Sequence, residues 1–258
     1  MSDKLSREKF ISTLGEDSWD SNWEAIQRLS PEFFNASIDL LAVPKQKRHL
    51  SPKVQQLIAI AVDSSSTHLY LPGIRQHIKL ALEAGATKRE VMEVIELTST
   101  LGIHACNVGV PLLVDVMKEA GIYDNHPYAG KPLDPQREAL KVDFTKKRGY
   151  WHPTWEEFLA LDPEFFEAYL AFSSVPWEKD MDGTRGGLEP KVKEMIYCAF
   201  DAAATHLYVK GLRLHMVNVL KYGGTPEEIL EVLEIATQLS VHTAHAAAPI
   251  LEELAGRG

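Results

Sequence analysis

The chain has few cysteines, and their positions exclude a disulfide-stabilised fold. Only Cys106 and Cys198 occur in 258 residues. Neither has a cysteine counterpart in the internal repeat described below, where Ala244 and Ile60 occupy the matching positions. A disulfide framework is therefore not expected, and a reducing cytoplasm is the expected location.

The chain also lacks excess basic charge and long apolar runs. Its net charge of −9 argues against a nucleic-acid groove or an anionic membrane surface, because both attract basic patches. No uninterrupted apolar run approaches the roughly 20 residues of a membrane span, and residues 1–5 show no apolar signal core. We expect neither nucleic acid nor membrane as a partner.

What the chain does contain is an internal duplication. Residues 67–77 read THLYLPGIRQH, and residues 205–215 read THLYVKGLRLH, an offset of 138. The same offset relates residues 52–111 to residues 190–249 without a gap. A self-match of this length indicates a repeated structural unit. Asp, Thr, His, Tyr, Gly and Arg are retained in both copies, although a core alone would need only apolar residues.

The repeated segment has the pattern of an all-α fold. Apolar residues from Val91 onward follow the 3.6-residue period, and the sequences TKRE at 87–90 and TPEE at 225–228 are typical capping boxes. A helix is predicted to start at Pro52, with a break near Pro72-Gly73. No alternating strand pattern is evident. Trp and Phe residues at 19–34 recur at 151–166 with an offset of 132. The spacing between the copies therefore grows by six residues before the 138-residue offset begins, and residues 179–187 are predicted to form a longer loop.

The predicted architecture is two tandem helical units related by internal duplication. Gly, Pro and Asn are dense in residues 121–132, where helical periodicity stops. We therefore divide the chain into a first unit at 1–129 and a second at 130–258. The constant offset predicts that the two units pack about a pseudo-two-fold axis.

The repeated motif presents a candidate site. Positions i, i+3 and i+7 of a helix share a face, and this spacing places one residue set per copy together: Tyr70, Gly73 and His77, then Tyr208, Gly211 and His215. An imidazole can act as a general acid or base near neutral pH. We expect the side-chain-free space over each glycine to be a substrate pocket with room for a leucine side chain.

This motif resembles that of the carboxymuconolactone decarboxylase and AhpD-like family, whose peroxidase branch carries Cys-x-x-Cys-x-x-x-His. Aligning that histidine with His77 places the two family cysteines at Tyr70 and Gly73. Residues 85–94 (GATKREVMEV) resemble the family's Gly-x-Thr-x-x-Glu-Ile-x-Glu segment, and residues 101–107 (LGIHACN) resemble the decarboxylase branch's Gly-Val-Pro-Ala-Ala-Asn. The resemblance implies an all-helical homo-oligomer, a dimer or trimer.

The resemblance implies an enzyme, but the missing thiols change its chemistry. A dithiol peroxidase needs a nucleophilic thiolate and a resolving thiol. We expect instead a lyase-like or isomerase-like enzyme that decarboxylates, or moves a proton in, a small carboxylated or carbonyl-bearing molecule. The expected catalytic residues are His77, His215, His104 and His242. The expected substrate-binding residues are Arg75, Arg213, Tyr70, Tyr208, His68, His206, Gly73 and Gly211. No organic cofactor motif is visible.

Other interpretations remain open from the sequence. The histidines and tyrosines can be structural, and Arg75 and Arg213 can pair with Glu96 and Glu234. The chain can then be a non-catalytic binding or assembly protein. An AhpD-like hydroperoxide reductase is a further alternative. So is a metal-dependent enzyme using His68, His77, His104 and Glu96, although this spacing matches no standard zinc motif and we expect no metal.

Thiol chemistry is predicted to be dispensable, because other residues occupy the family's cysteine positions. The double substitution Cys106→Ala and Cys198→Ala should leave turnover within about tenfold of the unsubstituted protein. Steady-state kinetics on both proteins would check this. A loss of more than about 100-fold, in a variant with unchanged helix content, would show that a thiol takes part.

Overall fold

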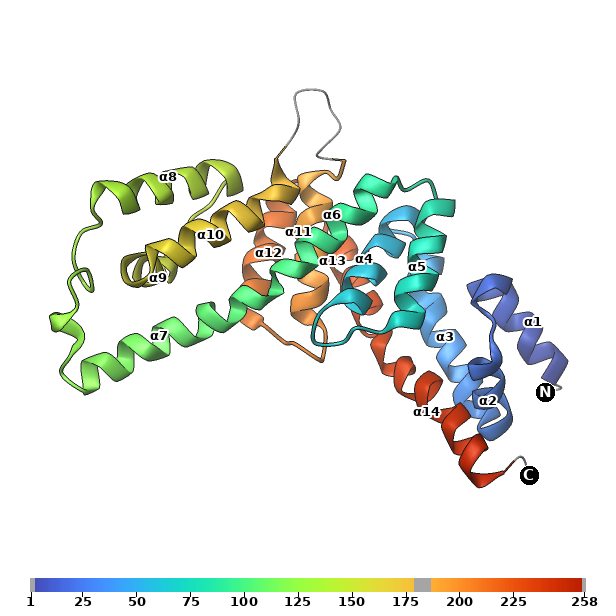
Figure 1. The fold of residues 1–258 in the computed structure, drawn as a ribbon. Helices are drawn as coiled ribbons and strands as arrows, with labels where there is room; N and C mark the ends of the chain where they lie inside the picture. The colour runs from blue at the N-terminus through green and yellow to red at the C-terminus, as the bar shows by residue number, and fades with distance from the viewer. Residues whose placement is uncertain (1–2, 179–186, 257–258) are drawn as a thin grey trace. The chain divides into compact units, whose positions relative to one another are not determined.

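In the computed structural model, the described residues, 3–178 and 187–256, form helices and turns and contain no strand, which confirms the all-α prediction (Figure 1). The predicted long loop lies, apart from Gly187, outside these residues. The elements are α1 (Asp3–Leu14), η1 (Glu16–Ser18), α2 (Ser21–Leu29), α3 (Pro31–Lys47), α4 (Pro52–Ser64), α5 (Leu71–Glu83), α6 (Lys88–Ser99), η2 (Thr100–Ile103), α7 (His104–Glu119), η3 (Tyr123–Asn125), α8 (Pro135–Arg148), α9 (Trp155–Leu161), α10 (Pro163–Ser174), η4 (Val175–Trp177), α11 (Pro190–Ala202), α12 (Val209–Lys221), α13 (Pro226–Ala236) and α14 (Leu239–Ala255).

Local hydrogen bonds explain where the repeat helices begin. The Glu90 backbone N–H donates to the Thr87 hydroxyl, and the Thr87 N–H donates to the Glu90 carboxylate at 2.7 Å. Thr225 and Glu228 form the same capping box before α13. These reciprocal bonds satisfy two N–H groups that a helix start otherwise leaves unpaired. The capping signals in the sequence are thus confirmed.

The predicted break at Pro72-Gly73 is wrong in position, because the chain turns earlier. Helix α4 ends at Ser64 and α5 begins at Leu71. Pro72 lies in the first turn of α5, where a missing N–H costs nothing. In the turn itself, Leu69 adopts a left-handed φ of 46°, and Tyr70 N–H donates to the Asp63 carbonyl at 2.9 Å.

The described chain packs as two compact units that do not follow the order of the repeats. One unit contains residues 1–98 and 188–258, and the other contains residues 99–187. The predicted division at 129/130 follows the repeat along the chain, whereas packing groups α4, α5, α11, α12 and α13 of both copies in the larger unit. The reason is that each copy buries its apolar helices against the other copy.

Within the larger unit the two copies contact each other reciprocally. The equivalent residues Thr67 and Thr205 meet, with their hydroxyl oxygens 3.5 Å apart. Glu231 of the second copy accepts the Leu50 N–H of the first at 3.1 Å, and Glu93 of the first copy accepts the Leu188 N–H of the second at 3.0 Å. Equivalent residues that meet each other, and exchanged contacts, are the properties of a two-fold interface.

The first helices and the last helix together form an apolar core beside the repeats. Figure 1 shows α14 running alongside α2, so that both chain ends belong to the larger unit. Aromatic rings dominate this core, and Phe10 and Phe34 are fully buried. Its buried residues are Phe10, Leu14, Trp23, Ile26, Phe34, Ile38, Leu41 and Val241.

The smaller unit has its own aromatic core. Phe144 is fully buried and packs edge-on to Trp155, with ring centroids 4.5 Å apart. The other buried members are Ile103, Phe158, Leu159, Phe166 and Leu170. The repeated Trp and Phe residues at the start of each copy therefore fill two separate cores.

One helical stretch of the described residues, Lys88–Glu119, is long and apolar enough by composition to cross a membrane. Only 22% of its most apolar window is buried inside the structure. A single stretch of this kind is weak evidence, because helices of soluble proteins meet the same criteria.

We predict that Glu231→Ala will strongly destabilise the larger unit. The Glu231 carboxylate is fully buried and accepts N–H groups of His49, Leu50 and the Gln55 side chain. Removing it takes the acceptor from the buried Leu50 N–H and from the part-buried His49 N–H, and takes one of the acceptors of the Gln55 amide, which also donates to the Pro44 carbonyl. The expected cost is about 3–5 kcal/mol in the free energy of unfolding. Urea denaturation measures this, with the exposed Glu227→Ala of the same helix as control, expected to change stability by less than about 1 kcal/mol. Equal losses in both variants would contradict the bridging role of Glu231.

Candidate functional site

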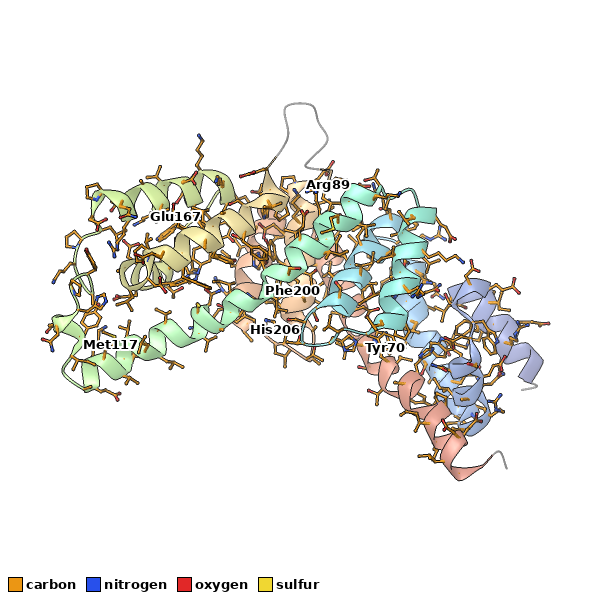
Figure 2. The ribbon with its side chains drawn as sticks, viewed as in Figure 1. Tyr70, Arg89, Met117, Glu167, Phe200 and His206 are labelled. Carbon is orange, nitrogen blue, oxygen red and sulfur yellow. The ribbon has the colours of Figure 1, made fainter. Side chains whose placement is uncertain are left out.

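A cavity of about 140 Å³ lies in the larger unit, between the first helices, the start of α5 and α14. Figure 2 labels Tyr70 where the chain enters α5 beside α14. The apolar wall of the cavity is formed by Phe10, Leu14, Trp23, Leu41, Pro72, Gly73, Leu80 and Val241. Its polar wall is formed by Asp17, Ser18, Asp20, Lys45, Tyr70, Gln76, His77, Gln238, His242 and His245. A cavity with one apolar wall and convergent polar groups is typical of a small-molecule site.

Three of the polar residues form a hydrogen-bonded chain that reaches the cavity. His245 Nε2 lies 3.0 and 3.1 Å from the two oxygens of Asp20. His245 Nδ1 lies 2.5 Å from the Tyr70 hydroxyl and 3.4 Å from the Asn22 amide. These residues come from the start of α2, the turn before α5, and α14. Tertiary packing alone brings them together.

The ionised state of Asp20 determines which atoms of this hydrogen-bonded chain carry a hydrogen. Partial burial alone would raise the pKa of Asp20, but hydrogen bonds from His245, Trp23 and Asn22 outweigh it, and the pKa is lowered. An ionised carboxylate only accepts, so His245 Nε2 carries the proton that it donates to Asp20. In neutral His245, Nδ1 is then the acceptor of the Tyr70 O–H.

Tyr70 is held as a protonated phenol. Burial raises its pKa above the ordinary value, and the nearby charges of Asp63 and Asp20 raise it further. Its ring stacks on the His242 imidazole with centroids 3.9 Å apart, which holds the hydroxyl in place. The Tyr70 hydroxyl can therefore donate a proton, and His245, which is hydrogen-bonded to it, is placed to replace that proton.

Asp63, at the end of α4, lies at the centre of a second cluster. Its side chain is 2% exposed, and burial raises its pKa to about 8. Three imidazoles surround it: His68 Nε2 and His242 Nδ1 lie 4.0 and 3.6 Å from Oδ1, and His77 Nε2 lies 3.7 Å from Oδ2. His68 Nε2 and His242 Nδ1 are 2.9 Å apart. Asp63, His68 and His242 offer atoms close enough together to hold a metal ion.

His77 is held in its neutral form. Its Nδ1 lies 2.7 Å from the Gln56 side-chain oxygen, so that Nδ1–H donates and Nε2 keeps its lone pair. Burial lowers the pKa of His77 to about 4, and the Lys45 charge lowers it further. Burial likewise lowers the pKa of His242 to about 3, with added repulsion from His68, His77 and His245. These imidazoles face Asp63 as neutral groups.

In the structure, the cationic side chain that lines the cavity is Lys45 and not the predicted Arg75. Arg75 and Arg213 are exposed, and neither is among the described residues that line the cavity. The ion pairs considered for them form with other partners, since Arg89 binds Glu96 at 2.9 Å and Lys47 binds Glu234. Lys45 lines the cavity, and burial lowers its pKa.

The second copy arranges its residues differently. His215 is buried, and its Nδ1 lies 2.6 Å from the Glu194 carboxylate, where the first copy has Gln56. Burial raises the pKa of Asp201 to about 8, and Glu194 adds to the effect. His206 and Tyr208, with ring centroids 6.3 Å apart, lie in the turn before α12; Figure 2 labels His206.

His104 was expected beside His77, but His242 takes that place. His242 is the repeat counterpart of His104. Of these two histidines, His242 is the one that lines the cavity. His104 begins α7, in the smaller unit. The cavity of the first copy is thus completed by the last helix of the second copy, because α14 packs against α2.

The space over Gly73 is not the open pocket that the sequence suggested. A Cβ atom there would lie 1.9 Å from Asp63 Oδ2 and 2.7 Å from the Tyr70 ring. At Gly211, a Cβ would lie 2.4 Å from Asp201 Oδ2. Each glycine therefore allows a buried carboxylate to approach its helix, and the cavity lies beside Gly73. The expectation that leucine would fit is wrong.

Sequence reasoning missed the central role of Asp63 and the roles of Asp20, Lys45 and His245. The predicted site did not include Asp63, although this residue ends an apolar run and recurs as Asp201. That recurrence was an available signal. His245 has Asn107 as its repeat counterpart, so the repeat could not indicate it.

A second cavity, of about 300 Å³, lies in the smaller unit. It is lined by Ser99, Thr100, Gly102, Ile103, Cys106, Phe165, Ala168, Tyr169 and Phe172. Burial and the charge of Asp162 raise the pKa of Cys106, which keeps its thiol protonated. This cavity is larger, but it brings no carboxylate or imidazole together, so the candidate chemistry lies at the Tyr70 cavity.

Comparison with known proteins agrees with this fold. The model of the carboxymuconolactone decarboxylase family matches residues 31–107 and 163–253. A crystal structure from Burkholderia xenovorans LB400 is 46% identical, covers 98% of this chain and 97% of its own, and superposes with a TM-score of 0.89. That protein carries the provisional name of a gamma-carboxymuconolactone decarboxylase subunit. No curated protein matches the chain.

We predict that Gly73→Ala will disrupt the Asp63 cluster. The added methyl group overlaps the Asp63 carboxylate and must displace it, at a cost of about 1–3 kcal/mol in stability. Thermal denaturation measures this cost. The matched control is Gly109→Ala on α7, where a Cβ meets no atom within 4 Å and stability should hold or rise. Equal melting temperatures for the two variants would contradict the close approach at Gly73.

Proposed function

Because the chain belongs to the carboxymuconolactone decarboxylase family, we propose that it is a lyase that decarboxylates a small carboxylated, carbonyl-bearing molecule in the Tyr70 cavity. The observation that supports this most is the chain from Asp20 through His245 to the Tyr70 hydroxyl at the cavity wall. The provisional name of the 46%-identical neighbour points to a lactone acid as the first candidate substrate.

The cavity suits a small acid in size and polarity. Its volume of about 140 Å³ is close to that of cavities of about 150 Å³ that admit benzene, which limits the substrate to a single ring or a short chain. Phe10 and Trp23 offer an apolar wall for the carbon skeleton, and Lys45 offers an ammonium group for a carboxylate. Gln76 adds an amide beside them.

The proposed reaction needs a group that stabilises the electron pair of the broken carbon–carbon bond, and a donor of one proton. When the bond between the carboxylate and its neighbouring carbon breaks, CO₂ leaves and the electron pair moves into the adjacent carbonyl to form an enolate. A preorganised donor or cation near that carbonyl oxygen stabilises the enolate. The carbon then takes a proton, which regenerates the carbonyl.

The Asp20–His245–Tyr70 chain can supply that proton. With a second proton on His245, its Nδ1–H donates to the Tyr70 oxygen and leaves the Tyr70 O–H free to point at the cavity. Tyr70 transfers its proton to the enolate carbon and takes up the Nδ1 proton of His245. Asp20 stabilises the imidazolium and fixes the ring orientation. His245 is then reprotonated from solvent.

A thiol mechanism is not part of the proposal. Cys106 and Cys198 are free, and neither is among the described residues that line the Tyr70 cavity. Burial raises the pKa of both, with nearby carboxylates adding to it, so that both are protonated thiols. Protonated thiols are poor nucleophiles.

The proposal also includes a cytoplasmic homo-oligomer. Large apolar side chains are exposed on α7 and α14, among them Leu112, Val116 and Leu254. A second copy of the chain would remove such surface from water. The net charge of −9 supports a small-molecule substrate over a nucleic acid.

The test begins with gamma-carboxymuconolactone and a panel of short 3-keto acids, with CO₂ release as the readout. Tyr70→Phe is expected to lower kcat about 10²–10⁴-fold with little change in KM, because it removes the proton donor and keeps the ring. The matched control is Tyr128→Phe, at an exposed tyrosine of the smaller unit, which should keep full activity.

Asp20→Asn separates proton transfer from packing. It keeps the shape of the side chain but removes the charge that stabilises the His245 imidazolium, so kcat should fall while the melting temperature changes little. The absence of CO₂ release across the panel, or equal kcat in Tyr70→Phe and the unsubstituted protein, would overturn the proposed function.

A further inference from the structure

The cluster around Asp63 has a geometry that hydrogen bonding does not explain. His68 Nε2 and His242 Nδ1 are 4.0 and 3.6 Å from Asp63 Oδ1, and His77 Nε2 is 3.7 Å from Oδ2. Hydrogen bonds between such atoms are about 2.7–3.2 Å long. Three ring nitrogens therefore face one carboxylate at distances beyond direct bonding.

Burial makes this arrangement costly as it stands. Asp63 is 2% exposed, and its Oδ2 accepts no hydrogen bond from any residue that the structure describes. A buried carboxylate without a partner is strongly unfavourable unless a proton neutralises it or a cation compensates for its charge. Lys45 is the lysine among the described residues that line the neighbouring cavity, and its ammonium group donates toward the Leu14 carbonyl and not to the Asp63 carboxylate. A cation from solution would compensate the carboxylate.

The donor set matches a transition-metal site. Bonds of about 2.0–2.1 Å to a tetrahedral ion place ligand atoms about 3.3 Å apart. The three separations among His68 Nε2, His242 Nδ1 and Asp63 Oδ1 are 2.9, 3.6 and 4.0 Å, on both sides of that value. Two imidazoles and one carboxylate form a common binding set for divalent iron and zinc.

The surrounding structure holds these ligands in place. Tyr70 N–H binds the Asp63 carbonyl and fixes the end of α4, and the left-handed Leu69 turns His68 back toward it. The Tyr70 ring stacks on His242. Gly73 leaves room for the carboxylate. Metal sites depend on such supporting contacts for ligand orientation.

We propose that Asp63, His68 and His242 bind one divalent transition-metal ion beside the Tyr70 cavity, with zinc as the reference ion. His77 Nε2, with its free lone pair 3.7 Å from Asp63 Oδ2, is the nearest further donor. His242 also lines the cavity, so the site adjoins the space proposed for substrate. This deepens the proposed function, because a divalent ion can polarise a carbonyl and stabilise the negative charge of the enolate that decarboxylation forms. Metal binding itself does not require that reaction.

The experiment measures metal binding on the full chain. Protein is stripped with a chelator, dialysed against Zn²⁺, and analysed for bound zinc by mass spectrometry. Binding of Co²⁺ is followed separately by its visible absorption. Asp63→Asn and His242→Gln should each lose one metal equivalent per chain relative to the unsubstituted protein. They should also lose the cobalt absorption of that site.

The matched control is His49→Asn, at an exposed histidine outside the cluster, which should bind the same amount of metal as the unsubstituted protein. His68→Gln is a further ligand variant in case one substitution unfolds the chain, as judged by circular dichroism. Full metal content in folded ligand variants, or no bound metal in the unsubstituted protein, would overturn the proposal.

The two proposals fail separately. If the stripped protein binds no metal but still releases CO₂ in a Tyr70-dependent manner, the metal site is wrong and the proposed function stands. If metal binds through Asp63 and His242 but no substrate of the panel reacts, the site stands and the proposed function is wrong.

Discussion

The burial of one carboxylate organises this structure. Asp63 ends an apolar helix with its side chain 2% exposed, and it fits only because Gly73 has no Cβ. The turn between α4 and α5 is built to hold it, through the Tyr70 N–H and the left-handed Leu69. The imidazoles of His68, His77 and His242 face this carboxylate at 3.6–4.0 Å. Keeping a negative charge at this buried position costs free energy, and binding of a proton or a cation offsets that cost.

The duplication produced two unequal sites from one plan. Both copies keep the buried aspartate, the close glycine and the histidine four residues later. Around that histidine, however, the first copy has Gln56 and the second has Glu194, so His215 has a carboxylate partner at 2.6 Å where His77 has a neutral amide. The first copy alone also receives His245 from α14. The two copies therefore differ in the groups that surround the same repeated histidine.

The comparison of sequence and structure shows which signals carry information. Helix starts and ends were predictable because capping residues act within four positions, as at Thr87 and Glu90. The break before α5 was misplaced because its cause is Leu69, a residue type that rarely adopts positive φ. Arg75 had the right chemistry for a carboxylate but lies on an exposed face. Lys45 lines the cavity instead, from helix α3, which precedes the gap-free match at residues 52–111.

The sequence by itself determined the all-α class, the duplication and the retained polar motif, since periodicity, capping and a constant offset are properties of neighbours along the chain. Tertiary structure alone decided the site. Asp20, Tyr70 and His245 are separated by up to 225 residues and meet because α14 packs against α2. The same packing replaces His104 with His242 beside His77. Contacts between copies depend on how two apolar surfaces cover each other, which spacing within one copy does not encode.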